Sequence, residues 1–231
     1  MFHVAVDPHR QFYEGCYSEV FHDGCQGWGS ELVDRQVERF TIGGDGTSRI
    51  LEIGAGSGEH LKFVRYKPRW TEYVALDLTP RISNPETAAT AEALPNFRFV
   101  AGDAANVPFD DNYFDLVIST CVLAHVAEPE QVFMDLRRVT KSGGRIVIGM
   151  PCDPGFVNQL FKRLLTYRVM KRAGVPDPKL DYARQHRNPI HNLLAFANHV
   201  FRDDDLRVRY FPFRIPSWNL NVIATLVVDV T

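Results

Sequence analysis

An apolar strand that runs directly into a glycine-rich turn constrains this chain more than any other feature. Residues 50–60 read Ile-Leu-Glu-Ile-Gly-Ala-Gly-Ser-Gly-Glu-His, so glycine occupies positions 54, 56 and 58. Because glycine has no Cβ and tolerates positive φ, such a turn lets the backbone approach a ligand closely. The dinucleotide-binding pattern G-x-G-x-x-G needs a glycine at position 59, where this chain has Glu59. Taken alone, the turn is also compatible with an ordinary strand–helix connection.

Further strand candidates follow the turn in order along the chain. Residues 73–76 lead into Asp77, and an acid at this point of a βαβ unit can accept hydrogen bonds from both hydroxyls of a ribose. Residues 97–100 lead into Gly102-Asp103-Ala104, and residues 114–119 supply another strand. Lys141-Ser-Gly-Gly144 is expected to close a helix and to open a strand over 145–150. Strands that alternate with helical segments indicate a parallel sheet covered on both faces.

The order E-x-G-x-G-x-G, hydrophobic-Asp, G-D-A, F-D-L-V and a helix ending R-V-x-x-x-G-G resembles the class I S-adenosylmethionine-dependent methyltransferases, above all their small-molecule "type 11" branch. The resemblance covers residues 48–151. It implies an α/β fold with a doubly wound, mostly parallel, Rossmann-like seven-stranded sheet. An N-terminal helical segment and a helical insertion before the last two strands would complete it, with one antiparallel strand in the final pair.

Within a single domain, the resemblance predicts four parts that differ in role. These are an N-terminal helical cap, a cofactor-binding core, a helical lid and a final strand pair, over residues 1–47, 48–151, 152–204 and 205–231. The implied cofactor is S-adenosyl-L-methionine, bound across the carboxyl ends of the strands beside the first strand.

The resemblance assigns the methionyl side of the cofactor to the glycine turn. The backbone of Gly54, Ala55, Gly56 and Gly58 would pack against the methionyl and ribose portion. Glu52 matches the family's acidic position ahead of the glycines and would reach the methionine ammonium through a water.

The adenosine side is assigned to the next two strand ends. Asp77 matches the ribose-binding acid, with Leu78 beside the adenine. Asp103 matches the acid that accepts from the adenine amino group, and the N–H of Ala104 would face the ring. Asp103 could equally be an ordinary turn-forming residue after a glycine.

The acceptor side is expected after the fourth strand, where Ser119 would open onto the methyl group. His125 follows, and a neutral imidazole there could take a proton from a hydroxyl or an amine. The alternative is that His125 orders the loop through hydrogen bonds. Tyr13 and Tyr17 lie in a segment that often folds over the cofactor in this family, although aromatic residues at i and i+4 are also simple packing partners on a helix.

The predicted insertion is basic, with eight basic residues against three acids over 153–190. One interpretation is a lid that recognises an anionic acceptor, with Arg163, His186 and His191 as substrate-contacting candidates. A basic amphipathic helix over 156–173 could instead lie on an anionic membrane surface. A solvated helix face that caps the sheet is the third reading.

Composition and charge limit the binding partners and the cellular location that we expect. A net charge of −2 argues against nucleic-acid binding, and no stretch approaches the ~20 apolar residues of a membrane span. No signal peptide is evident, and the four cysteines show no zinc-ligand spacing. We therefore expect a cytoplasmic protein with reduced thiols and without a metal; the oligomeric state stays open.

The sequence thus predicts an enzyme that methylates an O or N atom of a small molecule. The candidate acceptors are a sugar, a lipid-linked intermediate or a secondary-metabolite intermediate, either neutral or anionic, and an anionic one would suit the basic insertion. Carbon methylation of a quinone-like ring, and a non-catalytic S-adenosylmethionine-binding regulatory protein, remain as alternatives. A nicotinamide-dependent oxidoreductase is disfavoured by the missing glycine at 59 and by the G-D-A motif.

Overall fold

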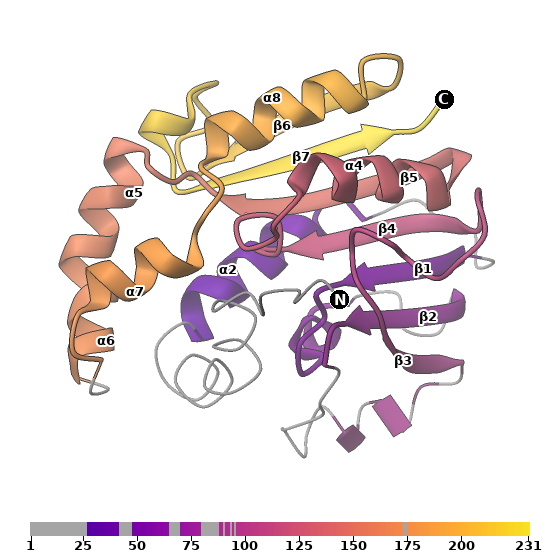
Figure 1. Cartoon of the computed structure of the whole chain (residues 1–231), viewed down its shortest axis with the longest axis horizontal. Coiled ribbons are helices and arrows are strands. Elements are labelled where there is room, and N and C mark those ends of the chain that lie inside the picture. The colour runs from indigo at the N-terminus through magenta and orange to yellow at the C-terminus, as the bar shows by residue number, and fades with distance from the viewer. Residues whose placement is uncertain are drawn as a thin grey trace, which may run out of the picture.

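The fold is built on one seven-stranded sheet with the strand order β3-β2-β1-β4-β5-β7-β6 (Figure 1). The computed structural model describes residues 27–41, 48–64, 70–79, 88–89, 91–92, 94, 96–172 and 175–231. The strands are β1 Ser48–Ile53, β2 Trp70–Asp77, β3 Phe97–Ala101, β4 Phe114–Thr120, β5 Thr140–Pro151, β6 Asp205–Phe211 and β7 Ile223–Asp229. Neighbouring strands from β3 to β5 pair in parallel, whereas β7 is antiparallel to both β5 and β6. The predicted sheet, with its one antiparallel strand at the end, is confirmed.

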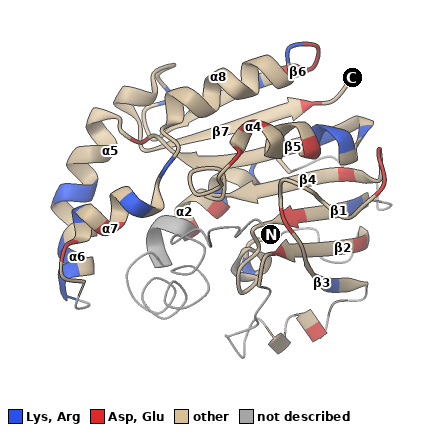
Figure 2. Cartoon of the chain, viewed as in Figure 1, with Lys and Arg blue, Asp and Glu red and all other residues tan. Residues whose placement is uncertain are grey.

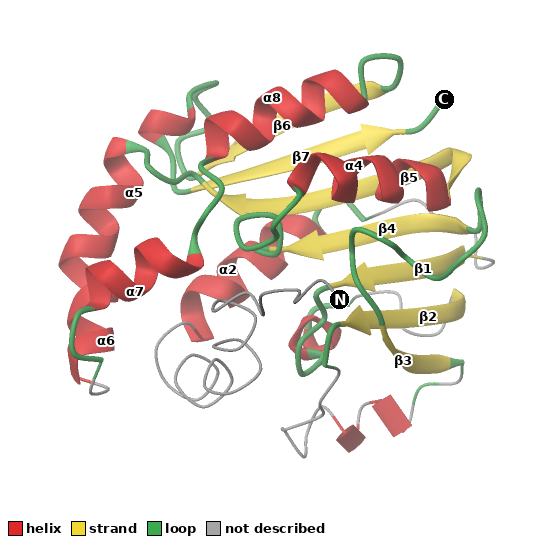
Figure 3. Ribbon diagram, in the orientation of Figure 1, coloured by secondary structure: helices red, strands yellow, loops and turns green. Residues whose placement is uncertain are grey.

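Helices cover both faces of this sheet (Figure 3). They are α2 Gly27–Glu38, α4 Pro129–Val139, α5 Phe156–Phe161, α6 Tyr167–Arg172, α7 Pro178–Gln185 and α8 Ile190–Val200. Shorter turns are the 3₁₀ helices η2 Glu59–Lys62 and η4 Trp218–Leu220, and a π-helical segment, η3 Lys162–Thr166, joins α5 to α6. Helices α4 and α8 pack together on one face, and α2 packs on the other face against β4 and β5.

Strand alternation explains why both faces are buried. In β5, Ile146 and Ile148 belong to the core beneath α4 and α8, whereas Val147 belongs to the core beneath α2. Successive side chains of a strand point to opposite faces, so a near-continuous apolar run fits a sheet that is covered twice. Gly149 allows α2 to approach, because a Cβ there would lie 2.5 Å from Val33.

One predicted boundary is wrong. Residues 141–144 do not close a helix: α4 ends at Val139, and β5 begins at once with Thr140 paired to Phe114. The register shifts before Arg145, and Gly143 takes a positive φ of 78°, so the four residues form an irregular start to the strand. The segment after the glycines, η2, is a single 3₁₀ turn, closed by bonds from Leu61 N to Gly58 O and from Phe63 N to His60 O.

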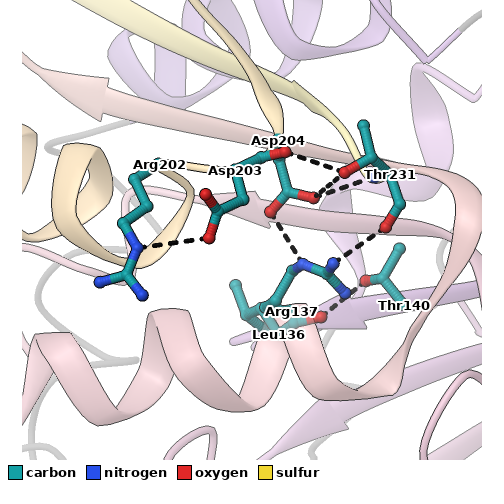
Figure 4. A network of polar contacts seen from close by, with 7 residues as sticks. All are labelled: Leu136, Arg137, Thr140, Arg202, Asp203, Asp204 and Thr231. Atoms are coloured by element: carbon teal, nitrogen blue, oxygen red, sulfur yellow. Dashed lines mark hydrogen bonds and ion pairs between the residues drawn. The ribbon is translucent and has the colours of Figure 1, made fainter.

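One buried carboxylate, that of Asp204, joins the C-terminal ends of α4, α8 and β7 (Figure 4). Its side chain is 2% exposed and accepts from Arg137 Nε at 2.8 Å and from Thr231 N at 2.9 Å. Arg137 also donates to the carbonyl of Thr231 at 3.1 Å. The neighbouring Asp203, by contrast, is 85% exposed, and its carboxylate contacts Arg202 alone among the described residues.

These two adjacent acids give a matched pair for a stability test. Replacing Asp204 with Ala leaves Arg137 without its buried partner and should lower the free energy of unfolding by about 2–4 kcal/mol. Replacing Asp203 with Ala should change it by less than about 0.5 kcal/mol, since exposed ion pairs contribute little. Urea unfolding of both variants measures the difference; equal losses would show that the Asp204 network does not hold these elements together.

Candidate active site

The carboxyl ends of three adjacent strands bring the predicted site residues together. Strand β1 lies between β2 and β4, and all three run in the same direction. The glycine turn after Ile53, Asp77 at the end of β2, and Ser119 near the end of β4 therefore share one edge of the sheet. Strand order reverses beside β1, which is where open α/β sheets bind their ligands.

The turn after β1 has a conformation that glycine suits best. Gly54, Gly56 and Gly58 have φ values of 65°, 52° and 79°. At Gly54 a second constraint is added, because a Cβ would lie 2.1 Å from the Cγ2 atom of Val122, in the loop after β4. The turn therefore packs directly against the loop after β4, which a merely local strand–helix connection would not require.

Asp77 links the glycine turn to the end of β2. Its Oδ2 atom accepts from Gly56 N at 2.9 Å, and Oδ1 accepts from Thr79 N at 3.1 Å. A carboxylate offers about four acceptor positions, so each oxygen can still accept from a ribose hydroxyl. Leu78 beside it is 45% exposed and offers an apolar surface of the kind that an adenine ring would cover. This arrangement fits the adenosyl group of S-adenosylmethionine.

The loop after β3 lies beside Asp77. Gly102 N donates to the carbonyl of Asp77 at 2.9 Å. The exposed Asp103 uses Oδ1 to accept from Ala105 N at 3.0 Å and so forms a tight turn, which is the structural role considered above for this residue. No hydrogen bond or ion pair within the described part of the chain involves its Oδ2 atom, and Ala104 is buried against the main core. Asp103 therefore shapes the turn, and its contact with an adenine stays a prediction.

A buried ionic cluster lies at the base of the turn, and the sequence reasoning missed it. His60 Nδ1 is 3.0 Å from Asp34 Oδ1, and His60 Nε2 is 3.3 Å from Glu38 Oε2. Burial opposes the charged ring, but the contacts with Asp34 and Glu38 outweigh it and raise the pKa of His60 to about 10. Asp34 and Glu38 are four residues apart, so they share a face of α2. The charged imidazolium therefore ties α2 to η2, the segment directly after the glycines.

Glu52 belongs to the same buried region. It is 2% exposed and accepts from the hydroxyl of Tyr73 at 2.6 Å. Burial raises the pKa of Glu52 to about 7, although nearby His60 favours its charged form. Its only side-chain hydrogen bond among the described residues thus goes to the sheet, and the contact with the methionine ammonium stays a prediction.

The end of β4 carries further signs of a ligand site. The hydroxyl groups of Ser57 and Ser119 are buried and have no hydrogen-bond partner among the described residues. Cys121 takes a positive φ of 61°, a strained conformation for a residue with a Cβ. Burial raises the pKa of its thiol to about 12, so it is neutral. Unpaired buried hydroxyls beside a strained turn suit a polar ligand, because native proteins rarely leave such groups unsatisfied.

The loop after β4 is fastened to the residues that follow α7. Asn188 Nδ2 donates to the carbonyls of Leu123 at 2.9 Å and Val126 at 2.8 Å. The backbone N–H groups of Arg187 and Asn188 both donate to the carbonyl of Ala124. The second half of the insertion and the loop after β4 therefore form one connected unit.

His125 and His186 meet where these two segments join. His125 Nδ1 donates to the carbonyl of Gln185 at 2.8 Å, since a carbonyl can only accept. The two imidazole rings lie 4.6 Å apart, and His186 stacks on Tyr182 at 3.8 Å. Burial lowers the pKa of His125 to about 4 and that of His186 well below its ordinary value, so both rings are neutral at pH 7.

The other predicted acceptor residues are placed differently. His191 lies against Trp218, with ring centroids 5.8 Å apart, and Arg163 is exposed on η3. Tyr13 and Tyr17 fall outside the described residues. Of the three substrate candidates, His186 is therefore the one that the structure shows in contact with His125.

Comparison with known proteins finds a family model that matches part of the chain. A family model described as "Methyltransferase domain" matches residues 51–148, which span the glycine turn, Asp77, Asp103 and β4. Residues 51–148 are thus similar to a methyltransferase domain, in agreement with the resemblance to the class I S-adenosylmethionine-dependent methyltransferases. Its family cofactor is S-adenosylmethionine, and the acceptor-side residues after position 150 lie beyond the matched region.

The curated relatives of this region have names that refer to quinone biosynthesis. A demethylmenaquinone methyltransferase of Paenarthrobacter aurescens is 32% identical over 123 residues, covering 53% of this chain and 46% of the relative. The ubiquinone/menaquinone biosynthesis C-methyltransferase UbiE of Stutzerimonas stutzeri is 33% identical over 137 residues, covering 57% and 53%. The chain thus spans about half the length of the curated relatives it matches.

Solved structures share the fold of the methyltransferase domain. Phosphoethanolamine N-methyltransferase 2 of Haemonchus contortus, in complex with S-adenosyl-L-methionine, superposes with a TM-score of 0.65 at 16% identity, covering 98% of this chain and 60% of that one. A SAM-dependent methyltransferase of Thermotoga maritima gives 0.60 at 14% identity, covering 96% and 100%. At such identities the likeness concerns the fold alone.

The charged state of His60 predicts how stability depends on pH. The folded domain keeps a proton on His60 that the unfolded chain releases above about pH 6.5. The stabilisation is therefore complete below that pH and is lost as the pH rises toward 10. Replacing His60 with Gln should lower the free energy of unfolding at pH 7 by about 2–5 kcal/mol, because the carboxylates lose their buried partner.

Urea unfolding at pH 6.5, 8 and 9.5 measures this effect, and the variant should show a shallower decline with pH than the wild type. His199 supplies the control: it is 64% exposed and 3.9 Å from Glu130, so its replacement by Gln should change stability by less than about 0.5 kcal/mol. Parallel pH profiles for the wild type and the His60 variant would contradict a buried imidazolium.

Proposed function

We propose that the protein is an enzyme that transfers a methyl group from S-adenosylmethionine to an O or N atom of a small molecule. The observation that carries the proposal is the convergence of the glycine turn, Asp77 and the His125–His186 pair around the carboxyl ends of β1, β2 and β4. The bound sulfonium supplies an activated methyl carbon, so no further electrophilic catalyst is needed from the protein. The task of the chain's own residues is to hold the reactants in line, which can contribute ~7–11 kcal/mol.

Each group has a distinct part in this arrangement. Asp77 and the glycine turn would hold the ribose and methionyl portion, and Asp103 the adenine. The buried hydroxyl of Ser119 would contact the cofactor near its reacting end. His125 keeps its proton on Nδ1, because Nδ1 donates a hydrogen bond to the backbone carbonyl of Gln185. The lone pair of the ring is therefore on Nε2.

The low pKa of His125 defines what it can do. A ring with a pKa of about 4 is a weak base at pH 7, but its Nε2 lone pair can accept a hydrogen bond from a hydroxyl or an amine. Its contribution would be to orient the acceptor and to receive its proton late in the transfer. The same Nδ1 contact also orders the loop, so catalysis and loop ordering require separate readouts.

The surroundings of the histidine pair favour an acceptor whose reacting group is uncharged. Lys162 contacts the ring of Tyr182 at 3.9 Å, but Asp153 neutralises it at 2.6 Å. Arg163, considered above for an anionic acceptor, is exposed on η3. An anionic portion of the acceptor would have to reach outward from the neutral pair toward such exposed basic residues.

Carbon methylation of a quinone-like ring is the second candidate. It is favoured by the curated relatives, which are named demethylmenaquinone methyltransferase and UbiE C-methyltransferase. The same cofactor site would serve either reaction, and a reduced quinone also presents a hydroxyl group to His125. A non-catalytic protein that binds S-adenosylmethionine is the remaining alternative.

Product analysis separates these functions. The protein is incubated with methyl-labelled S-adenosylmethionine and either a metabolite extract or a reduced naphthoquinone, and S-adenosylhomocysteine is quantified. We expect S-adenosylhomocysteine and a labelled product, whose NMR spectrum shows whether the methyl group is on O, N or C. Saturable binding of S-adenosylmethionine without turnover in either mixture would contradict the enzyme and support a regulatory protein.

Replacing His125 with Ala tests its role once an acceptor is known. Turnover should fall by about 10²-fold, the lower end of general acid–base contributions, while the Kd for S-adenosylmethionine should change less than about threefold. His191→Ala is the matched control, since His191 lies against Trp218, and it should leave kcat nearly unchanged. Equal losses of turnover and cofactor affinity in His125→Ala would assign the residue to loop structure alone.

A further inference from the structure

Exposed apolar side chains gather in two segments of the insertion and the C-terminal region. Seven of the ten strongly exposed large apolar residues of the described chain lie there. Four lie along α5 and η3, namely Phe156, Leu160, Leu164 and Leu165, and three lie between β6 and β7, namely Phe213, Ile215 and Leu220. Phe156 and Phe213 are the most exposed, at 66% and 60%. Exposed apolar clusters of this kind mark surfaces that bind a protein, a membrane or a ligand.

The two segments touch and form one surface. Phe156 N donates to Asn219 Oδ1 at 2.7 Å, which joins the start of α5 to the connection between β6 and β7. Gly155 makes this approach possible, because a Cβ there would lie 2.6 Å from the carbonyl oxygen of Trp218. We refer to residues 156–172 and 212–220 together as the α5–α6 surface.

The connection between β6 and β7 holds its apolar side chains outward in a fixed conformation. Asn221 is fully buried, and its Nδ2 atom donates to the carbonyls of Ile215 at 2.9 Å and Ser217 at 2.8 Å. Its Oδ1 atom accepts from Phe213 N at 3.0 Å. The exposure of Phe213 and Ile215 is therefore built into the fold.

All charged residues in both segments are basic. Neither residues 154–176 nor residues 206–228 contain an Asp or a Glu. The exposed basic residues of the α5–α6 surface are Arg163, Arg168, Lys171, Arg172 and Arg214. Figure 2 shows basic residues along the helices of this side of the molecule. An apolar surface with basic residues and no acids is complementary to an apolar layer that has an anionic edge.

We propose that the α5–α6 surface docks on an anionic lipid bilayer. Phe156, Leu160 and Leu164 would enter the boundary between headgroups and acyl chains, and the Arg and Lys side chains would contact anionic headgroups. A second copy of this chain fits less well. A symmetric contact through the same surface would face the basic residues with one another, with no acid to pair with them.

The buried side of the same helix contacts the acceptor side of the candidate active site. Lys162 lies between Leu160 and Leu164 in the sequence, and its ammonium group is over Tyr182, which stacks on His186. A bilayer under the α5–α6 surface would therefore lie across one helix from the histidine pair. The docking itself does not depend on methyl transfer, so it can be tested alone.

Vesicle co-sedimentation of the full chain tests the proposal. We expect binding to phosphatidylcholine vesicles that contain phosphatidylglycerol, little binding to phosphatidylcholine alone, and weaker binding as salt is raised. The double variant Leu160→Ser/Leu164→Ser should lower the affinity at least about tenfold because it removes apolar contact with the bilayer. Arg168→Glu/Arg172→Glu should lower it by a similar factor.

Matched controls replace the same residue types elsewhere on the surface. Met134→Ser on α4, where the side chain is 51% exposed, and Arg202→Glu, 67% exposed, should bind vesicles like the wild type. Unfolding temperature and affinity for S-adenosylmethionine confirm that each variant is folded. Absence of binding to anionic vesicles would overturn the proposal, as would equal weakening by Met134→Ser. A wild-type dimer in light scattering that Leu160→Ser/Leu164→Ser turns into a monomer would assign the surface to self-association instead.

Discussion

The close approach of Gly54 to Val122 is the contact on which the candidate active site depends. With no Cβ at position 54, the turn after β1 can pack against the loop after β4. One side of this contact leads through Gly56 to Asp77, where an adenosyl group would be held. The other side leads to His125 and the residues after α7. Backbone packing thus sets the predicted cofactor side and the predicted acceptor side at a fixed separation.

A buried ionic cluster also holds the glycine turn in place. His60, Asp34 and Glu38 bring α2 to the residues directly after the glycines, in a region that is otherwise apolar. Buried ion pairs often add little net stability compared with apolar packing, but breaking one is costly. Here the cluster fixes the position of a short 3₁₀ turn that its own few hydrogen bonds would hold poorly. Tertiary contacts therefore stabilise this turn, which has few helical hydrogen bonds of its own.

Much of the fold follows from local sequence, because apolar runs, glycines and strand-end acids act over a few residues. The sheet, and the location of Asp77 and Asp103 at its carboxyl edge, could be predicted in this way. The sequence could not predict which candidate of the insertion contacts His125, because no local pattern determines how an insertion folds back. The structure places His186 there. Asp34, Glu38, Glu52 and His60 form their cluster across separate elements, and the i, i+4 spacing of the two acids in α2 is the local signal that the sequence offers for it. The early start of β5 depends on the pairing of Thr140 with Phe114, which is likewise a tertiary event.

The central claim is that S-adenosylmethionine is held by Asp77 over the glycine turn. Calorimetric titration of the wild type, Asp77→Ala and the exposed-acid control Asp110→Ala tests it most directly. We predict saturable binding by the wild type and by Asp110→Ala, and an affinity lower by about 10–100-fold for Asp77→Ala, as expected for loss of charged hydrogen bonds to a ribose. No saturable binding by the wild type, or equal affinity for wild type and Asp77→Ala when both are folded, would contradict the account.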